Sequence, residues 1–246
     1  MEQERTRLHL LDTLRGVTII SMVIYHALWN LANLQGVSMP WFENDFCYFW
    51  QQSICCTFIF LSGFCRALGT RHLKRGLLVF GGGLIVTIVT LIFLPDFPII
   101  FGILTFLGTA MLVLIPFDKF LKKAPPVLCT IISFLLFLLF KNCNSGFLGF
   151  GSINILPIPN FIYANLLTAF FGFPQNSFYS SDYFSLFPWI FLFLCGYFFC
   201  QLFKRENLLP KLKTKPVFLL NFIGRQSLII YLLHQPILYL ILSIIF

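Results

Sequence analysis

Residues 76–95, GLLVFGGGLIVTIVTLIFLP, are twenty consecutive positions without a charged side chain. A helix needs about 20 apolar residues to cross a hydrocarbon core of about 30 Å, so this stretch predicts a transmembrane helix. The glycine run inside it, 81–83, lacks the following Lys and Ser or Thr of a phosphate-binding loop. We expect these glycines to let a neighbouring helix approach closely.

Six further stretches are apolar enough to cross a membrane, or nearly so. The seven predicted spans are residues 10–33, 46–68, 76–95, 98–117, 125–141, 185–203 and 217–246. Only PDFP separates the third from the fourth, which predicts a tight antiparallel hairpin. The chain is 58% hydrophobic and 11% charged, whereas soluble domains carry roughly 25% charged residues. We therefore predict an all-α fold, a polytopic membrane helical bundle of about seven transmembrane helices, forming a single domain over residues 1–246.

The basic residues predict how this bundle is oriented. With a cytoplasmic N-terminus, every Lys and Arg except Lys141 falls on the inner side of the seven spans, including Arg5 and Arg7. Cytoplasmic loops prefer basic residues, so we expect a multi-pass protein of the plasma (inner) membrane. Membrane orientation also accounts for the net charge of +8, and no nucleic-acid partner is expected. Residues 142–184 then form one long external segment, which we interpret as a cap over the outer side.

Cysteine spacing gives no sign of a metal site. The eight cysteines contain no CxxC pair and no Cys/His pattern typical of zinc ligands. Most lie in apolar runs, where buried thiols pack as small hydrophobic groups. Cys47 and Cys143 fall on the predicted outer side, and a disulfide between them stays open because sequence does not set their distance.

Ionisable groups within a membrane helix are costly, and each is therefore a candidate functional residue. The first predicted helix carries a polar stripe within an arc of about 100°, formed by Asp12, Arg15, Ile19, Met22, His26 and Asn30. Asp12 and Arg15 are three positions apart and could simply pair as an anchor. His26 could be a general base for an attacking hydroxyl or amine, or could only bond a neighbouring helix.

The last predicted helix presents a second polar face. It carries Ser227, Tyr231, His234 and Gln235, followed by Pro236. Proline removes a backbone donor, so we expect a kink beside His234. Polar groups at such a kink can border a cavity or clamp two helices together, and both interpretations stay open.

Five strings of sequence, in this order, resemble the catalytic domain of the heparan-α-glucosaminide N-acetyltransferase family and its small bacterial relatives. They are RLHLLDTLRG (7–16), FIFLSGF (58–64), FGILTFL (101–107), SDYFSLFPW (181–189) and GRQSLIIYLLHQP (224–236). The first two also resemble the wider acyltransferase-3-like superfamily of membrane O-acyltransferases. The resemblance spans nearly the whole chain.

The resemblance implies an enzyme that transfers an acyl group, usually acetyl, from cytosolic acetyl-CoA. The implied acceptor is an amine or hydroxyl of an extracytoplasmic glycan or lipid-linked sugar, with the coenzyme A thioester and the lipid bilayer as the other partners and no metal. His26, His234, Asp12 and Arg15 match the implied catalytic elements. The animal enzyme has a further catalytic histidine after its first helix, and residues 31–45 contain none. Direct transfer is therefore expected instead of a covalent acetyl-histidine.

Several other residues are candidates for substrate binding. They are Gln235, Tyr231, Ser62, Asp182, Trp189 and Arg225. Ser62 precedes Gly63, which we expect to permit close helix approach, and it lacks the GxSxG context of a serine nucleophile. The alternative function is a small-molecule transporter or flippase without chemistry, which would also need a polar cavity but would be favoured by inverted repeats that the sequence does not show. A purely structural subunit is the third interpretation.

Overall fold

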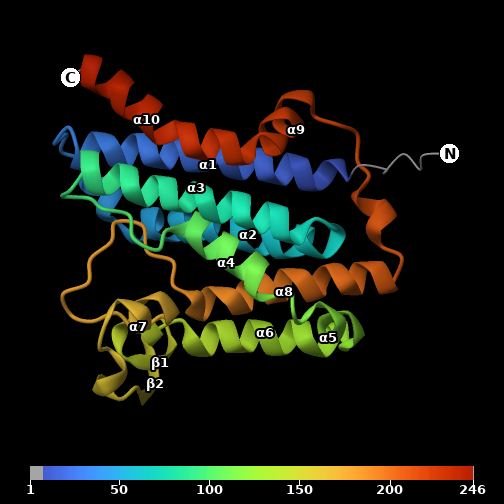
Figure 1. The fold of residues 1–246 in the computed structure, drawn as a ribbon. Coiled ribbons are helices and arrows are strands. Elements are labelled where there is room, and N and C mark those ends of the chain that lie inside the picture. Colours follow the sequence, from blue (N-terminus) through green and yellow to red (C-terminus); the bar gives the residue numbers. More distant parts are fainter. Residues whose placement is uncertain (1–7, 246) are drawn as a thin grey trace. The chain divides into compact units, whose positions relative to one another are not determined.

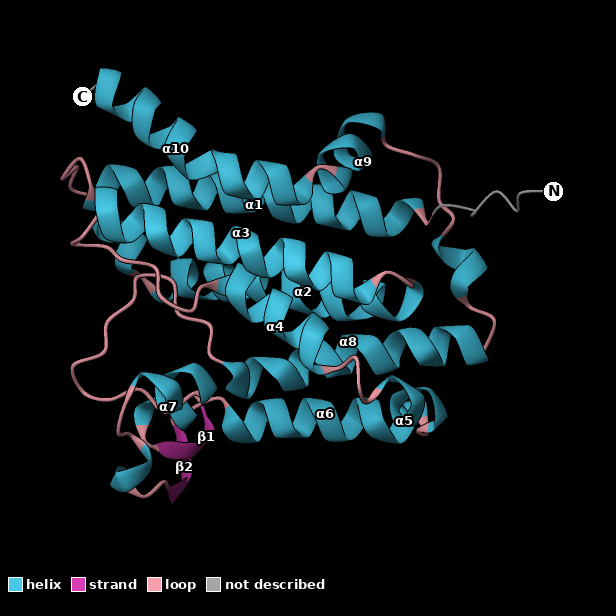
Figure 2. Cartoon of the chain, in the orientation of Figure 1, coloured by secondary structure: helices cyan, strands magenta, loops and turns pink. Residues whose placement is uncertain are grey.

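The computed structural model describes residues 8–245 and is mostly helical (Figures 1 and 2). Its helices are α1 (His9–Asn33), α2 (Asp45–Leu68), α3 (His72–Phe93), α4 (Ile103–Val113), α5 (Asp118–Lys123), α6 (Pro126–Phe140), α7 (Leu166–Phe171), α8 (Leu186–Arg205), α9 (Phe218–Arg225) and α10 (Ser227–Ile245). The strands are β1 (Phe147–Phe150) and β2 (Ile153–Pro157), which pair antiparallel in one small sheet. The predicted helical, membrane-type fold is confirmed.

Five helical stretches in the described part of the chain are long and apolar enough to cross a membrane. They are α1, α3, the stretch Pro126–Ser145 that contains α6, α8 and α10. α2 is 24 residues long but is not among them, because Gln51, Gln52 and Arg66 lower its mean hydropathy. α4 has only 11 residues, or about 16 Å of helix, roughly half of a hydrocarbon core. Seven crossings therefore stay a prediction.

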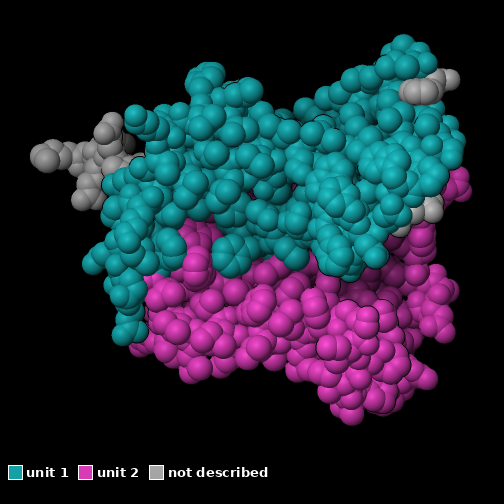
Figure 3. All heavy atoms as spheres, turned by 180° about the vertical axis from the view of Figure 1, so that it is seen from behind, with its two compact units in different colours: residues 1–61, 203–246 teal, residues 62–202 magenta. Residues whose placement is uncertain are grey.

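The chain divides into two compact units (Figure 3). Unit 1 contains residues 1–61 and 203–246, and unit 2 contains residues 62–202. Both boundaries fall inside helices, one in α2 and one in α8, and neither is a flexible linker. The single domain expected from the sequence stays a prediction.

In unit 1, two glycines allow α1 and α9 to pack with their backbones in contact. A Cβ atom built on Gly16 would lie 2.1 Å from the carbonyl oxygen of Leu220, and one on Gly224 would lie 2.0 Å from that of Asp12. Real Cβ atoms do not approach a carbonyl oxygen so closely, so only glycine fits at either position.

The last predicted span, 217–246, is not one helix. α9 ends at Arg225 and α10 begins at Ser227, with Gln226 between them. The buried Asn221 of α9 ties this short helix to α1, because Thr13 Oγ1 donates a hydrogen bond to Asn221 Oδ1 at 2.6 Å. The continuous helix expected here was wrong, whereas α10 does continue through Pro236.

In unit 2, α3 and α4 form the antiparallel hairpin that the sequence predicts. A Cβ on Gly83 would lie 2.5 Å from the Thr105 backbone nitrogen, and one on Gly108 would lie 2.4 Å from that of Phe80. The earlier residue of α3, Phe80, meets the later residue of α4, whereas Gly83 meets the earlier one, so the two helices run antiparallel. The packing role expected for the glycine run is confirmed at Gly83, whereas Gly81 meets nothing within 4 Å.

Gly63 makes a similar close approach within unit 2. A Cβ on this residue would lie 1.9 Å from the carbonyl oxygen of Phe193 in α8. The helix contact expected at this glycine is confirmed.

Residues 142–184 fold into the β1–β2 hairpin and the short helix α7, and tyrosine hydroxyls hold this segment together. Tyr163 donates to the carbonyl oxygen of Cys143 at 2.5 Å, and Tyr183 donates to that of Ala169. Burial raises the pKa of Tyr183, so its hydroxyl stays protonated and remains a donor. The role of this segment as an outer cap stays a prediction.

All eight cysteines lie in the described residues, and no disulfide joins any two of them. The buried thiol of Cys47 hydrogen-bonds to the carbonyl oxygen of Trp41 at 3.6 Å, and the buried thiol of Cys143 to that of Phe187, also at 3.6 Å. The disulfide that the sequence left open is not formed in this structure.

The glycine run permits a matched stability test. Gly83→Ala is expected to lower the thermal midpoint of the detergent-solubilised protein, because overpacking against Thr105 costs about 1–3 kcal/mol. Gly81→Ala adds the same methyl group into open space and is expected to leave the midpoint unchanged or slightly raised. Equal midpoints for the two variants would show that the α3–α4 contact does not require Gly83.

Candidate active site

Two histidines from opposite ends of the sequence lie together in unit 1. His26 belongs to α1 and His234 to α10, and their ring centroids are 5.0 Å apart. His234 is 7% exposed, and Tyr231 lies against its ring with centroids 5.3 Å apart. The polar stripe of the first helix and the polar face of the last helix therefore meet, as the sequence predicts for groups that must avoid lipid.

A chain of side-chain amides orients His26. Asn30 Nδ2 donates to Gln235 Oε1 at 2.9 Å, and Gln235 Nε2 lies 3.1 Å from His26 Nδ1. Because the amide nitrogen of Gln235 is a donor, Nδ1 of a neutral His26 accepts and its proton sits on Nε2. His26 thus presents an N–H group at Nε2, the ring nitrogen that Gln235 does not contact.

His234 has the opposite arrangement. Its Nδ1 lies 2.5 Å from the carbonyl oxygen of Tyr231, which can only accept, so Nδ1 carries the proton. Nε2 of His234 is buried and has no hydrogen-bond partner among the described residues, and the same holds for Oδ1 of Asn30. A buried acceptor without a partner is costly, and such groups are typical of sites that bind a donor.

The other predicted residues of unit 1 lie away from this pair. Asp12 Oδ1 and Arg15 Nη1 are 3.8 Å apart, which is a weak ion pair and the simpler role that the sequence allowed. Arg15 precedes His26 by eleven residues, about 16 Å along the helix. Arg225 donates from Nε to the carbonyl oxygen of Asn221 in its own helix, at 3.1 Å. Their roles in catalysis and binding stay predictions.

Three predicted substrate residues lie in unit 2 and form no common site in the described contacts. Asp182 Oδ2 accepts a long hydrogen bond of 3.4 Å from the Ile103 backbone nitrogen, so it caps the start of α4. Trp189 is 5% exposed, and Lys141 Nζ lies 4.0 Å from its ring centroid. Ser62 is half-buried on α2. Binding of substrate by these residues stays a prediction, although Asp182 and Trp189 already have structural contacts.

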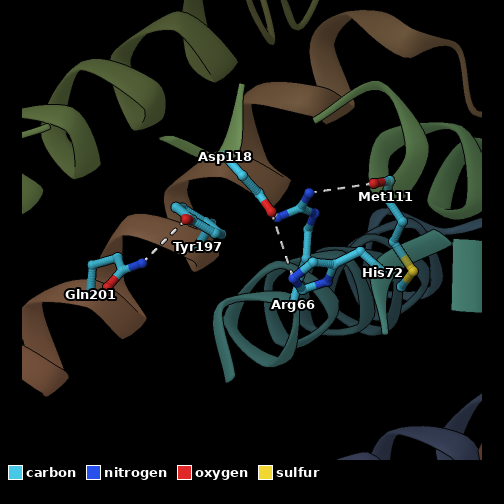
Figure 4. Close-up of polar contacts among 6 residues, drawn as sticks. All are labelled: Arg66, His72, Met111, Asp118, Tyr197 and Gln201. Carbon is cyan, nitrogen blue, oxygen red and sulfur yellow. Dashed lines mark hydrogen bonds and ion pairs between the residues drawn. The ribbon is translucent and has the colours of Figure 1, made fainter. Parts of the chain in front are cut away.

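A second polar cluster, which the sequence did not predict, lies in unit 2 (Figure 4). Arg66 of α2 is 4% exposed, and its Nη1 donates to Asp118 Oδ1 of α5 at 2.7 Å. Its Nη2 lies 3.5 Å from the carbonyl oxygen of Met111, and the guanidinium carbon lies 5.7 Å from the ring centroid of Tyr197. His72 Nε2 lies 3.8 Å from Asp118 Oδ2.

Two signals could have identified part of this cluster. Arg66 is a charged residue inside an otherwise apolar run, although the sequence assigned it only to a basic cytoplasmic loop. Asp118 is an acidic residue directly before three lysines at 119, 122 and 123. The pairing itself could not be predicted, because 52 positions separate the two residues.

Comparison with known proteins tests the resemblance directly. The family model described as "Heparan-alpha-glucosaminide N-acetyltransferase, catalytic" matches residues 7–236. No curated protein and no solved structure matches the chain. The family match contains both histidines and the whole of unit 2. Because it covers most of the sequence, the chain belongs to the family of the heparan-α-glucosaminide N-acetyltransferase catalytic domain, a family of membrane acetyltransferases.

Proposed function

We propose that this protein is a membrane-bound acyltransferase that moves an acetyl group from cytosolic acetyl-CoA to an amine or hydroxyl of an extracytoplasmic glycan or lipid-linked sugar. The family supports the acetyltransferase chemistry. The observation that carries the proposal is the buried Nε2 of His234, which has no hydrogen-bond partner within residues 8–245, on a ring whose centroid lies 5.0 Å from that of His26. A transporter would need polar groups here, but it would not need one ring nitrogen kept free as a base.

We assign opposite proton roles to the two histidines. The sequence suggested His26 as the general base, but the hydrogen bond from Gln235 favours a proton on its Nε2 and makes it a donor. The free Nε2 of His234 is the better acceptor for the proton of the attacking amine or hydroxyl. The Nε2–H group of His26 would then stabilise the negative oxygen that develops on the thioester carbonyl.

The proposed reaction is a direct transfer. The acceptor nitrogen or oxygen attacks the thioester carbon while His234 Nε2 takes its proton. The carbon–sulfur bond then breaks, and the protonated histidine returns the proton to the leaving sulfur, so that free coenzyme A and the acetylated acceptor are the products. Oδ1 of Asn30, which has no partner in the part of the chain that the structure describes, could accept a second hydrogen bond from an amine acceptor.

The membrane arrangement belongs to the same proposal. We infer seven crossings with a cytoplasmic N-terminus in a plasma membrane, supported by the bias of the basic residues. Arg5 and Arg7, which contribute to that bias, lie outside the described residues. α2 and α4 would be the two less apolar crossings, since proteins tolerate irregular or polar segments at membrane depth when other helices surround them.

The test is turnover of acetyl-CoA by the purified protein in detergent, followed as release of free coenzyme A. His26→Ala is expected to lower turnover about 10²-fold, the usual cost of losing one donor to a developing oxyanion. His9→Ala is the matched control, because it removes a histidine from the start of the same helix, where His9 contacts only Asn221 in the hydrogen bonds described. It is expected to retain wild-type turnover.

Two results would contradict the proposal. A folded wild-type protein that does not bind acetyl-CoA would exclude the acetyl donor and favour the transporter. Equal turnover by wild type and His26→Ala would remove His26 from the reaction.

A further inference from the structure

The cluster around Arg66 is built in two layers. Its inner layer is the buried pair of Arg66 and Asp118, whose charges cancel. Its outer layer consists of exposed cations of the α2–α3 loop, the first turn of α3 and α5. These are Arg71, Lys74, Arg75, Lys119, Lys122 and Lys123. A buried pair that fixes two segments and holds exposed cations beside each other is a suitable framework for binding an anion.

The contacts bring cations from both segments together. His72 Nε2 of α3 lies 3.8 Å from Asp118 Oδ2 of α5. Arg75 follows His72 by three positions on α3, and Lys122 follows Asp118 by four positions on α5, so each cation shares a helix face with one side of this contact. Nη1 of Arg75 folds back over the loop, since a Cβ on Gly69 would lie 3.1 Å from it. Arg75 and Lys122 are therefore the exposed cations that share a helix face with His72 and Asp118.

Within the described residues of unit 2, no carboxylate besides Asp118 lies near enough to balance the positive charge of these exposed cations. Besides Asp118, the described residues 62–202 contain only Asp96 and Asp182 as acidic side chains. Asp96 follows the C-terminal end of α3, and Asp182 caps the N-terminal end of α4. Because α3 and α4 are antiparallel, both acids lie at the opposite end of the hairpin from His72 and α5. The cations around Asp118 thus remain in clear excess.

We propose that Arg75 and Lys122, held by the Arg66–Asp118 pair, form a binding site for phosphate esters. Resting on the proposed function, the ligand is the adenosine 3′,5′-bisphosphate end of coenzyme A, while the thioester at its other end reaches into the membrane. A phosphate-bearing lipid headgroup presents the same chemistry and is the second source. Arg66 acts here as a positioning residue, because its guanidinium is already engaged by Asp118.

The experiment measures binding of adenosine 3′,5′-bisphosphate by titration calorimetry to the full-length protein in neutral detergent. This probe lacks the thioester, so its binding does not depend on turnover. The double variant Arg75→Gln/Lys122→Gln is expected to bind it about tenfold more weakly, as the loss of two charge-assisted contacts predicts. The matched control, Lys213→Gln/Lys215→Gln, removes two exposed cations from unit 1 and is expected to keep wild-type affinity.

Two further measurements distinguish coenzyme A from a lipid headgroup as the ligand, and distinguish failure of this site from failure of the proposed acyl transfer. Phosphatidylglycerol in phosphatidylcholine nanodiscs should compete with the probe if the site accepts lipid headgroups, and the absence of competition would assign the site to coenzyme A. Equal affinity of both double variants, or an equal loss in both, would overturn the site even if acetyl-CoA turnover is normal. Probe binding that depends on Arg75 and Lys122 in a protein without turnover would keep the site and reject the proposed acyl transfer.

Discussion

His234→Ala is expected to lower acetyl transfer by about 10²–10⁴-fold, the usual contribution of a general base. Nδ1 of this histidine is fixed by the carbonyl oxygen of Tyr231, and Nε2 is the buried acceptor that the mechanism needs. Alanine keeps the helix and removes only the ring. The measurement is the initial rate of coenzyme A release, with folding checked by gel filtration and circular dichroism.

Chemical rescue distinguishes a base from a structural residue at this position. Removal of the ring leaves a space in which added imidazole could take the acceptor's proton, so imidazole is expected to restore part of the rate of His234→Ala. It should not restore His26→Ala, whose missing group is a fixed donor beside Gln235. If His234→Ala fails to fold, His234→Gln keeps the side-chain volume and can be tested in its place. Full activity in either variant would exclude His234 as the base.

The membrane helices were the most predictable part of the fold. A run such as 76–95 has no alternative to a helix in lipid, because every backbone polar group there must be satisfied within its own segment. The meeting of α1 and α10 was also predictable in outline. His26 and Gln235 each lie on a polar face of an apolar helix, and two such faces are stable when they bond each other.

The exact lengths of the crossing segments could not be predicted. α4 ends at Val113 after 11 residues although the apolar run continues, because composition does not reveal where a chain turns inside protein. The break at Gln226 is similar, since it divides a run that is apolar on both sides. Both features depend on tertiary packing, such as the contact of Gly224 with α1.

Individual roles within the site were predicted only in part. The sequence identified His26 and His234 but could not assign their protons, because these depend on Gln235 and on the Tyr231 carbonyl oxygen. Asp182 looked like a ligand for a polar acceptor, and in the structure its carboxylate caps α4. Helix caps formed across 79 positions leave no local pattern in the sequence.

Asp118→Asn is expected to destabilise unit 2 by about 3–5 kcal/mol, the usual cost of leaving a buried charge without its partner. The side chain of Arg66 is 1% exposed, so water cannot replace the lost carboxylate. The ring of Tyr197, 5.7 Å from the guanidinium carbon, offers only a weak substitute. The measurement is the thermal midpoint in detergent, with Asp96→Asn as the control because this carboxylate is exposed.

A second variant shows whether the loss comes from the stranded charge. Arg66→Met combined with Asp118→Leu removes both charges and keeps apolar volume, and buried ion pairs replaced in this way are often neutral or stabilising. The double variant is therefore expected to recover most of the midpoint lost in Asp118→Asn. Recovery would mean that the loss in Asp118→Asn comes from the unneutralised charge of Arg66 and that an apolar pair would stabilise unit 2 equally well. The ion pair would then have a functional role, such as holding Arg75 and Lys122 toward a phosphate. A double variant as unstable as the single one would instead make the pair an ordinary packing element of unit 2.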